Sequence, residues 1–576
     1  MRILIIGGGV CGLSTYLALC KHLPKNQNHS LVIYEAHDLA PYVKAVADNQ
    51  DGHPPEPTGK AAQNETNIAA PGKVDDEQPA AFTPEIIGSA IGIMYNGLKV
   101  LSRIASPGPS GLTESQAPDI QSGRNAGFSE LMADVLRAGH PITTWNMSAA
   151  RGWKLIEVSM RPSSMRSKST KDSDQLQRGV TGIMISRQEF WQTLLTEVVR
   201  VATSDYGWGG VGQVLKQGRV TQVDWAEQDL DSSTAASTQS EVVFVTFEDG
   251  RCEAADLVIG ADGVRSTVRK AMFERWQSPT DKMSKPSISR RAEVPDYISP
   301  RYEGLKTGKM GIVFGANGFF GYGYSSSLHR DFPGRPTLDN VPSLVEPGTT
   351  AVWWSTFAST VENPYPVSDP QQNGKRPRPW DFDRIAALAA LLQRHRGWNN
   401  PAIQAILDYL ESRPEAVEGF YPTWTAPLLP TWHIGPVLLV GDASHALQPS
   451  SGQGTSQALE DAEALAICLS HYYRPLSSPV TDDEVWRMQT EKALKSFEKV
   501  RMPRVREQYD RSQRMGGMKG NMSVVTEMMM YGAVKLMGIL GRLFGGDKAL
   551  DGLLAYDLPS EVLKVLEVEE AADRNS

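Results

Sequence analysis

The sequence predicts an α/β fold in which a parallel sheet covered by helices is interleaved with an antiparallel sheet and followed by a helical C-terminal region. Three short buried strands support this prediction, because each runs directly into a glycine-rich turn. The strands are 3–6, 256–259 and 437–440, and the turns that follow begin at Gly7, Gly260 and Gly441. Short apolar runs bounded by glycine are typical of strands buried on both faces of a parallel sheet.

The first turn reads Gly-Gly-Gly-Val-Cys-Gly over residues 7–12 and is followed by a predicted helix over 12–22. In a strand-turn-helix of this kind Gly7 permits the tight turn, Gly9 lets the backbone approach a pyrophosphate, and Gly12 lets the helix pack closely on the strand. The pyrophosphate meets unpaired amides at the positive end of the helix. The pattern therefore predicts a dinucleotide site.

An acidic residue supports the prediction of a dinucleotide-binding site. The second buried strand, 31–34, ends at Glu35, which lies at the distance expected of a carboxylate that accepts hydrogen bonds from an adenosine ribose. An acid there favours a free 2′-hydroxyl over a phosphate. The alternative is a glycine turn without a ligand, but the strand before, the helix after and the acid downstream all favour the dinucleotide.

Length and composition exclude several classes of protein. The chain of 576 residues is longer than a single compact core accommodates, so two packed domains or one large domain with insertions are expected. Its 40% hydrophobic content is enough to form a sizeable core. The net charge of −8 and the lack of basic clusters argue against a nucleic-acid partner. Four scattered cysteines suit a reducing compartment and predict no metal site. No positively charged leader precedes the first strand, so a cytoplasmic location is expected.

Polar insertions separate the ordered segments. Residues 47–83 nearly lack large apolar side chains and are predicted to be a disordered loop, because they cannot bury enough surface to offset their ordering entropy. Similar stretches occur at 107–122, 163–177, 229–240 and 363–379. Between them, 241–248, 311–314 and 351–357 carry β-branched and aromatic residues and predict an antiparallel substrate sheet, whereas 187–199 predicts a helix.

The later glycine turns carry a family resemblance. The second continues through Asp262 and Gly263, and the third reads Gly-Asp-Ala-Ser-His from Gly441 and leads into a predicted helix over 455–469. With these motifs the chain resembles the group A flavoprotein monooxygenases of the para-hydroxybenzoate hydroxylase superfamily, most of all their fungal secondary-metabolite branch. The resemblance covers residues 1–45, 84–106, 180–330 and 350–515.

The resemblance implies a Rossmann-like FAD-binding domain with an interleaved antiparallel-sheet substrate domain and a C-terminal helical tail. We assign 1–45, 84–200, 241–275 and 435–475 to the FAD-binding domain, 276–434 mainly to the substrate domain, and 476–576 to the helical region. No second strand-GxGxxG-helix is present, so NADPH or NADH is expected to bind transiently as the electron donor.

The resemblance also implies roles for individual residues. Gly441 and Asp442 would hold the ribityl chain of FAD, and Asp262 with Gly263 is associated with both FAD and the nicotinamide donor. Arg187 matches a family arginine near the cofactor. Ser89 and Ala90 match a short loop after the second strand, here displaced by the long insertion.

The start of the predicted helix at 455 completes the candidate site. Gly452, Gly454, Thr455 and Ser456 would aim amides and the positive helix end at the flavin, where reduced flavin is negative. Pro449 would shape the pocket beside the flavin ring. His445 could relay protons or attach the flavin covalently, but we favour a structural role in shaping the loop.

These observations predict an enzyme that uses FAD, NAD(P)H and dioxygen to hydroxylate or epoxidise an aromatic or unsaturated small molecule, with a secondary metabolite as the expected substrate. A flavin-dependent reductase on the same scaffold and a non-catalytic flavin-binding interaction protein are the alternatives. The lysine and tryptophan signatures of flavin halogenases are missing. The sequence identifies no catalytic base.

The C-terminal region contains an apolar, methionine-rich stretch over 522–544. Glu527, Lys535 and Arg542 interrupt it, and each charge at a bilayer centre costs roughly 2.5 to 3.5 kcal/mol. A buried or pocket-covering helix is therefore favoured over a membrane span. Peripheral membrane contact stays open, especially for a lipophilic substrate.

Overall fold

The computed structural model describes residues 1–24, 29–48, 90–104, 130–160, 180–204, 210–225, 242–275, 290–291, 308–325, 351–359, 361, 364–367, 382–414, 417, 425–473, 483–516, 522–544 and 547–575. The predicted insertions at 107–122, 163–177 and 229–240 lie outside these residues, as do most of 47–83 and 363–379. The candidate site residue Ser89 also lies outside them.

A six-stranded sheet contains all three predicted buried strands. Its order is β16-β17-β11-β1-β2-β7, and every neighbouring pair is parallel except β16 with β17. The strands are β1 (Arg2–Ile6), β2 (Ser30–Glu35), β7 (Leu215–Gln217), β11 (Leu257–Gly260), β16 (His433–Ile434) and β17 (Val437–Leu439). Ile3, Leu4 and Ile5 of the central β1 are fully buried, as expected of a strand covered on both faces.

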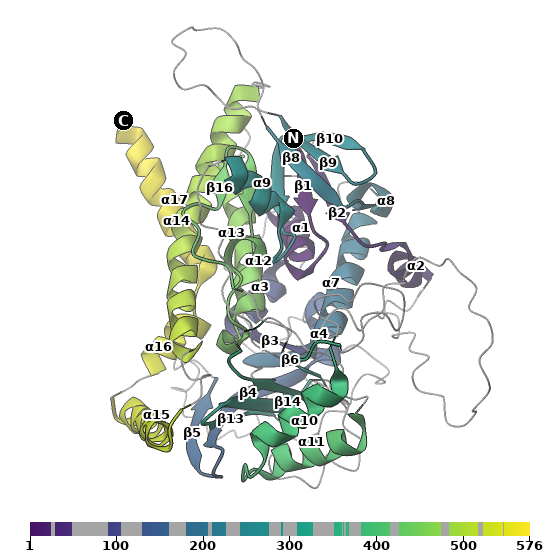
Figure 1. Ribbon diagram of the computed structural model, residues 1–576. Helices are drawn as coiled ribbons and strands as arrows, with labels where there is room; N and C mark the ends of the chain where they lie inside the picture. Colours follow the sequence, from purple (N-terminus) through teal and green to yellow (C-terminus); the bar gives the residue numbers. More distant parts are fainter. Residues whose placement is uncertain are drawn as a thin grey trace, which may run out of the picture.

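Helices pack around this sheet. They are α1 (Val10–His22), α2 (Ala40–Asp48), α3 (Tyr95–Ile104), α4 (Glu130–Ala138), α7 (Arg187–Ala202), α8 (Val211–Val214), α9 (Thr267–Arg275), α12 (Asp442–His445) and α13 (Gly454–Tyr472). α1 packs against both α7 and α13, which places the first glycine turn between them (Figure 1). The helices predicted over 12–22, 187–199 and 455–469 are confirmed as α1, α7 and α13.

A small antiparallel sheet corrects one prediction. The strand predicted over 241–248 exists as β9 (Val243–Phe247), but it pairs with β8 (Val220–Asp224) and β10 (Cys252–Ala255) and not with the substrate sheet. Its buried face belongs to the same apolar core as β1. The prediction of its sheet was wrong because alternating burial identifies a strand without identifying its partner. Here the hairpin with β10 leads directly into β11 and holds β9 beside the parallel sheet.

A larger sheet contains the strands predicted at 311–314 and 351–357. Its order is β12-β15-β14-β13-β4-β6-β3, with β5 paired to β4; the pair β13 and β4 is parallel and the other pairs are antiparallel. The strands are β3 (Ala90–Met94), β4 (His140–Ala149), β5 (Lys154–Ser159), β6 (Gly182–Ser186), β12 (Arg290–Arg291), β13 (Gly308–Gly315), β14 (Gly318–Tyr324) and β15 (Ala351–Thr356). Segment 84–200 thus gives helices to the first layer and strands to this sheet.

The two faces of the larger sheet are covered differently. α10 (Arg384–His395) and α11 (Pro401–Ser412) pack on one face, where Phe320, Tyr322 and Trp353 form a core with them. Side chains of the other face pack against two C-terminal helices, α15 (Val524–Phe544) and α16 (Asp547–Leu554). Figure 1 shows this sheet below the six-stranded sheet, with α10 and α11 beneath it.

The C-terminal region is helical, as predicted. It consists of α14 (Asp483–Gly516), α15 (Val524–Phe544), α16 (Asp547–Leu554) and α17 (Leu558–Asn575). α14 and α17 pack against α13 and against each other, whereas α15 packs beside β5 (Figure 1). In the described residues no helix combines the length and the apolar character that crossing a bilayer requires. The layers together confirm the predicted α/β fold with an interleaved, mostly antiparallel sheet.

Candidate functional site

Four loops meet at one edge of the six-stranded sheet. β17, β11, β1 and β2 are adjacent and parallel, so the turns after their carboxyl ends lie side by side. The predicted site residues Gly441, Asp262 and Gly7 lie in the turns after β17, β11 and β1, and Glu35 is the last residue of β2. Ligands of open parallel sheets bind at such an edge, where the strand order reverses on either side of the first strand. The fold therefore assembles motifs that lie more than four hundred residues apart.

The three glycines of the first turn have the three expected environments. Gly7 has φ +111°, and a Cβ there would lie 2.5 Å from the carbonyl oxygen of Ala261. A Cβ on Gly12 would lie 1.9 Å from the carbonyl oxygen of Gly7, so α1 packs directly on the turn. At Gly9 no atom of the described residues lies within 4 Å of a Cβ position. The turn is closed toward the protein at Gly7 and Gly12 and open at Gly9.

Glu35 lies beside this turn. One carboxylate oxygen accepts a hydrogen bond from the Gly8 amide at 2.7 Å, and the other accepts from the His37 amide at 3.1 Å and lies 2.7 Å from its ring nitrogen. Burial raises the pKa of this carboxyl, but the hydrogen bonds from His37 and Gly8 outweigh it and lower the pKa. Glu35 is thus an anion at the rim of the glycine turn.

Asp262 caps a helix. Its carboxylate accepts hydrogen bonds from the Ser266 hydroxyl at 2.5 Å and from the amides of Thr267 and Val268 at 2.7 and 3.1 Å, at the start of α9. Burial is the largest influence on this group and raises its pKa. Gly263 follows with φ +78° and, within the described part of the chain, open space around it. The second turn thus offers backbone to a ligand while Asp262 holds α9.

Arg269 joins the second and third turns. Its buried guanidinium donates to the carbonyl oxygen of Ala443 at 2.9 Å and to that of Val264 at 2.6 Å. Because Ala443 belongs to the turn after β17, this one side chain fixes the spacing of the two loops. The sequence analysis did not identify Arg269; its signal is an arginine in the first turn of the helix that follows the second motif.

The third turn is held by Asp461. Gly441 has φ +60°, and its amide donates to Asp461 Oδ2 at 2.8 Å; His445 Nε2 lies 2.6 Å from the same oxygen. All three residues are buried, whereas Asp442 is exposed at the edge. The geometry supports the structural role favoured for His445, because its ring is tied to the anchor of the loop. It leaves the Asp442 carboxylate turned outward.

Asp461 belongs to a buried ionic network between α13 and α14. Arg501 Nε donates to Asp461 Oδ1 at 2.8 Å, and Arg501 Nη1 donates to Glu460 at 2.5 Å. Burial raises the pKa of both carboxyls, but Arg501 contributes to lowering each below its usual range. Arg504 also reaches Glu460, at 3.3 Å. Sequence reasoning missed this cluster, although its signal is a Glu-Asp pair inside the apolar run of the predicted helix.

The start of α13 connects the third turn to the larger sheet. Gly452 has φ +61°, and a Cβ there would lie 2.9 Å from Met94 Cε. Ser456 is fully buried, and its hydroxyl accepts a hydrogen bond from the Met94 amide at 3.1 Å. Gly454 faces open space among the described residues. Pro449 is exposed and Thr455 is half-buried. The hydroxyl of Ser456 is therefore used inside the protein.

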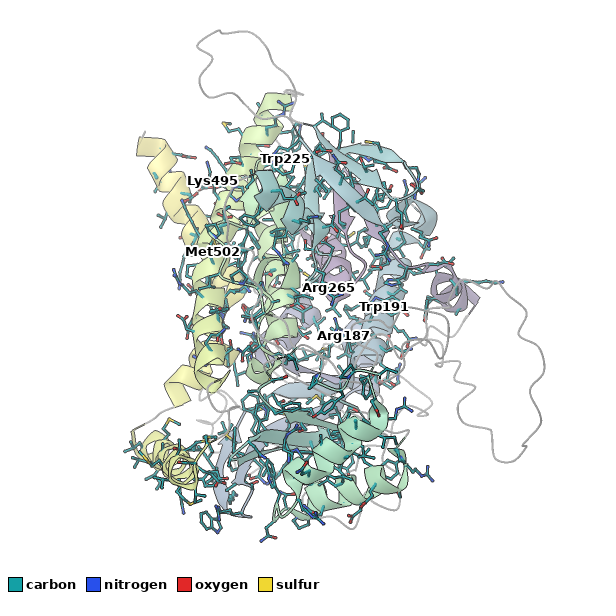
Figure 2. All side chains as sticks on the ribbon, viewed as in Figure 1. Arg187, Trp191, Trp225, Arg265, Lys495 and Met502 are labelled. Carbon is teal, nitrogen blue, oxygen red and sulfur yellow. The ribbon has the colours of Figure 1, made fainter. Side chains whose placement is uncertain are left out.

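α7 contributes two residues near the first turn. Arg187, its first residue, is exposed, and Figure 2 shows it at the end of α7 nearest the larger sheet. Trp191, one turn further along, donates from Nε1 to the carbonyl oxygen of Gly8 at 2.8 Å. Trp191 therefore braces the glycine turn from the side and was missed by the sequence analysis. Ala90 lies at the start of β3 and not in a loop, paired with Ser186.

A methionine-rich cluster adjoins the site. Its buried members are Met94, Met160, Met184, Met310, Tyr95, Ile142, Val352, Leu553 and Leu554. Trp145 of β4 packs against this cluster, and its Nε1 is buried without a hydrogen-bond partner among the described residues. Met94 also contacts the Gly452 turn, so the apolar cluster begins where α13 begins. Buried polar groups normally find a partner, so the Trp145 N–H is an exception among the described residues.

Comparisons with known proteins agree on one family. The family model described as FAD binding domain matches residues 423–479. The aurachin C monooxygenase/isomerase of Stigmatella aurantiaca is 28% identical over 229 residues, covering 40% of this chain and 46% of that protein. The FAD-dependent monooxygenase cle3 of Aspergillus versicolor is 30% identical over 275 residues, covering 46% of each chain.

The fold likeness extends much further than the sequence likeness. The crystal structure of Klebsiella pneumoniae HpxO complexed with FAD and uric acid has a TM-score of 0.52 and 18% identity, covering 98% of this chain and 97% of that one. By contrast, the aligned part spans about half the length of the curated relatives it matches.

Proposed function

Since this chain belongs to the group A FAD-dependent monooxygenases of the para-hydroxybenzoate hydroxylase type, we propose that it inserts one oxygen atom from dioxygen into an aromatic or unsaturated small molecule. The reaction would be a hydroxylation or an epoxidation, with NADPH or NADH as transient electron donor. FAD, when bound, supplies the two-electron redox chemistry and the reaction with dioxygen. The main support for the proposal is that three glycine-rich turns and the acidic end of β2 lie together at one edge of the six-stranded sheet.

The open positions of these turns support FAD as the ligand. At Gly9, Gly263 and Gly454 no atom of the described residues lies within 4 Å of the position that a Cβ would take. The backbone at these glycines is therefore open to a cofactor. In the proposed complex the backbone at Gly9 approaches the pyrophosphate, Gly7 and Gly12 shape the turn that presents it, and Glu35 accepts from the ribose. The remaining proposed contacts are Ser89, Ala90, Arg187, Asp262, Gly263, Gly441, Asp442, Pro449, Gly452, Gly454, Thr455 and Ser456.

The beginning of α13 provides favourable electrostatics for a flavin. The helix runs for 19 residues, and its first amides at Gly454 and Thr455 have no partner one turn earlier in the helix. The positive end of such a helix stabilises a nearby anion by about 0.3 to 2 kcal/mol. This chain thus offers backbone amides to the charge that a reduced flavin carries, and needs no charged side chain for it.

The methionine cluster supports an apolar substrate. Met94, Met184 and Met310 are flexible and polarisable, and such side chains adapt to large and irregular apolar molecules. The N–H of Trp145 adds one hydrogen-bond donor to this surface. We therefore propose a substrate that is mostly hydrocarbon, with one carbonyl or ether oxygen that accepts from Trp145. Secondary metabolites of this kind fit the fungal origin of several relatives.

Isotope labelling tests the reaction. The FAD-loaded protein is incubated with NADPH or NADH, labelled dioxygen and a panel of prenylated and polycyclic aromatic compounds, and the products are analysed by mass spectrometry. A product containing one labelled oxygen atom is expected. A product that gains two hydrogens without label would establish the reductase alternative. If the protein retains FAD but consumes no NADPH, NADH or dioxygen, the result would support the alternative of a non-catalytic flavin-binding interaction protein.

A pair of glycine variants tests the position of FAD. In Gly9→Ala the added methyl meets no atom of the described protein, so the fold should persist while FAD affinity falls about tenfold or more, a loss of at least 1.4 kcal/mol. Gly12→Ala forces a Cβ to 1.9 Å from a backbone oxygen and should destabilise the protein itself. Flavin content and thermal unfolding separate the two effects. Unchanged FAD binding in Gly9→Ala would place the cofactor elsewhere.

A further inference from the structure

Helix α15 attaches to the protein along one narrow side. Tyr531 is buried and its hydroxyl donates to the carbonyl oxygen of Phe314 at 2.8 Å; Glu527, also buried, accepts from the same hydroxyl at 2.6 Å. At Gly538 the helix comes so close to β5 that a Cβ would lie 2.8 Å from Ile156 Cδ1. Figure 1 shows α15 at the lower left edge of the molecule, beside β5. The helix is therefore docked firmly, but on one side.

The other side of α15 is apolar and faces outward. Seven large apolar side chains there, which we call the apolar stripe, are between 42% and 70% exposed: Val524, Val525, Met529, Leu536, Met537, Ile539 and Leu540. They are seven of the fifteen exposed large apolar side chains in the described part of the chain. Seventeen helical residues span roughly 25 Å at 1.5 Å per residue. An apolar surface of this extent on a protein marks an interaction site.

The surroundings of the stripe are aromatic and cationic. Among the exposed described residues of α15, Lys535 is the one with a charge. Trp153, 55% exposed at the turn between β4 and β5, lies with its ring 6.4 Å from the ring of Tyr531. Among the described charges of α15, of β5 and of the turn before β5, together with Lys309, which pairs with Glu157, the cations are Arg151, Lys154, Lys309 and Lys535 and the anions are Glu157 and Glu527. Four positive and two negative charges leave a net charge of +2 for this set. This contrasts with the net charge of −8 for the whole chain.

We propose that the apolar stripe of α15 and Trp153 form a membrane-docking surface that lies in the headgroup region of an anionic lipid bilayer. Such helices lie in the plane of the interface, with apolar side chains inserted and basic residues reaching toward the headgroups. An exposed tryptophan beside the stripe suits the same interface, where its ring is apolar and its N–H meets water. The proposal stands independently of the monooxygenase reaction.

A lipid surface fits the stripe better than a protein partner does. Protein interfaces are enriched in aromatic residues, methionine and arginine, and they carry about one hydrogen bond per 100 to 200 Å². The stripe contains methionines but no aromatic residue and no arginine, and the exposed polar residues beside it are Ser523, just before α15, and Thr526 and Lys535 on α15. Such a surface can insert into lipid without a fixed register, but it offers little that would orient one protein on another.

Vesicle binding by the FAD-loaded protein tests the proposal. Flotation with phosphatidylcholine vesicles and with vesicles that also contain phosphatidylserine is expected to recover the protein with both, and more with the anionic lipid. The double variant Met529→Ser with Met537→Ser should reduce binding about tenfold, which corresponds to 1.4 kcal/mol. The matched control is Met488→Ser, a methionine on α14 that is 54% exposed and outside the stripe, and it should bind like the unmodified protein.

The measurement has clear contrary outcomes. Unmodified protein that stays with the soluble fraction at both lipid compositions overturns the proposal. So does a double variant that still floats while its flavin content shows that it is folded. Analytical sedimentation without vesicles tests the alternative that the stripe binds a second copy of this chain. If the unmodified protein is a dimer and the double variant a monomer, the stripe is a dimer interface and the membrane proposal is wrong.

Discussion

Helices α14 and α15 are consecutive in the chain, yet α14 buries charged side chains against the protein while α15 exposes apolar side chains to solvent. α14 buries cations: Arg501 is fully buried and Arg504 nearly so. α15 exposes the apolar stripe. The difference follows from what each helix faces. Glu460 of α13 lies opposite the two arginines, whereas α15 meets the larger sheet with one side only. Burial in this region therefore follows the available partner and not the residue type.

The largest effect is expected at Arg501. Arg501→Met leaves Glu460 and Asp461 buried without their main cation, and breaking such a pair costs about 3 to 5 kcal/mol of unfolding free energy. Because Asp461 also holds Gly441 and His445, flavin retention should fall as well. Denaturant unfolding and flavin absorbance measure the two effects. Arg506→Met, an exposed position on the same helix, should change stability by about 0.5 kcal/mol or less.

A smaller, pH-dependent effect is expected where α14 holds the segment before β17. Burial lowers the pKa of His433, but the carboxylates of Glu491 and Glu498, which lie 3.7 and 2.8 Å from its ring nitrogens, outweigh burial and raise the pKa from 6.5 to about 9. The stabilisation is therefore complete below about pH 6.5 and is lost as the pH rises through about 9. The shift corresponds to roughly 3 kcal/mol at most, and the exposure of Glu491 reduces this to about 2 kcal/mol.

The variant His433→Gln isolates this contribution. Its deficit in unfolding free energy relative to the unmodified protein should be largest near pH 6 and should shrink toward pH 9.5, as measured by urea unfolding across that range. The contact with His433, together with Lys495, lowers the pKa of Glu491 to about 2, so the contribution of Glu491 is already complete above pH 4.5. A deficit that is constant between pH 6 and pH 9.5 would show that the His433 contact is not ionic.

The next effect concerns the attachment of α15. Tyr531→Phe removes the hydroxyl that Phe314 and Glu527 share, which should cost about 1 kcal/mol. The loss should be local, because no other described part of α15 is tied by such a bond to the sheet backbone. Hydrogen exchange should therefore quicken over 524–540 while α14 stays protected. Equal acceleration in both helices would mean that they unfold together.

The smallest effect is expected on the apolar stripe. Met537→Ser replaces a side chain that is 64% exposed, so the stability of the protein in solution should change by about 0.5 kcal/mol or less. Thermal unfolding provides the measurement. A loss of more than 2 kcal/mol would show that Met537 packs against protein in solution, and the contrast between the two helices would then be smaller than the structure indicates.

Local patterns predicted well the sheet edge at which the glycine turns meet. Each of the three turns is predicted from a buried strand and a glycine that lie within ten residues of each other in the sequence. The three strands are neighbours in the sheet, as β17, β11 and β1. The strand at 241–248 shows the limit of such patterns, because the alternation in Val243, Val245 and Phe247 is the same in either sheet. Its partner is chosen by the hairpin that follows. The assignment of individual residues to FAD contacts stays a prediction.

The sequence by itself determined the fold class, the three glycine turns and the acidic residue after β2, because each depends on residues close together in the chain. Only the tertiary structure decided that Asp461 anchors the third turn, that Arg501 pairs with it from forty residues away, and that Trp191 braces Gly8. It also decided which side of α15 is covered. Burial and ion pairing are properties of contacts between distant segments, and no local pattern contains the partner.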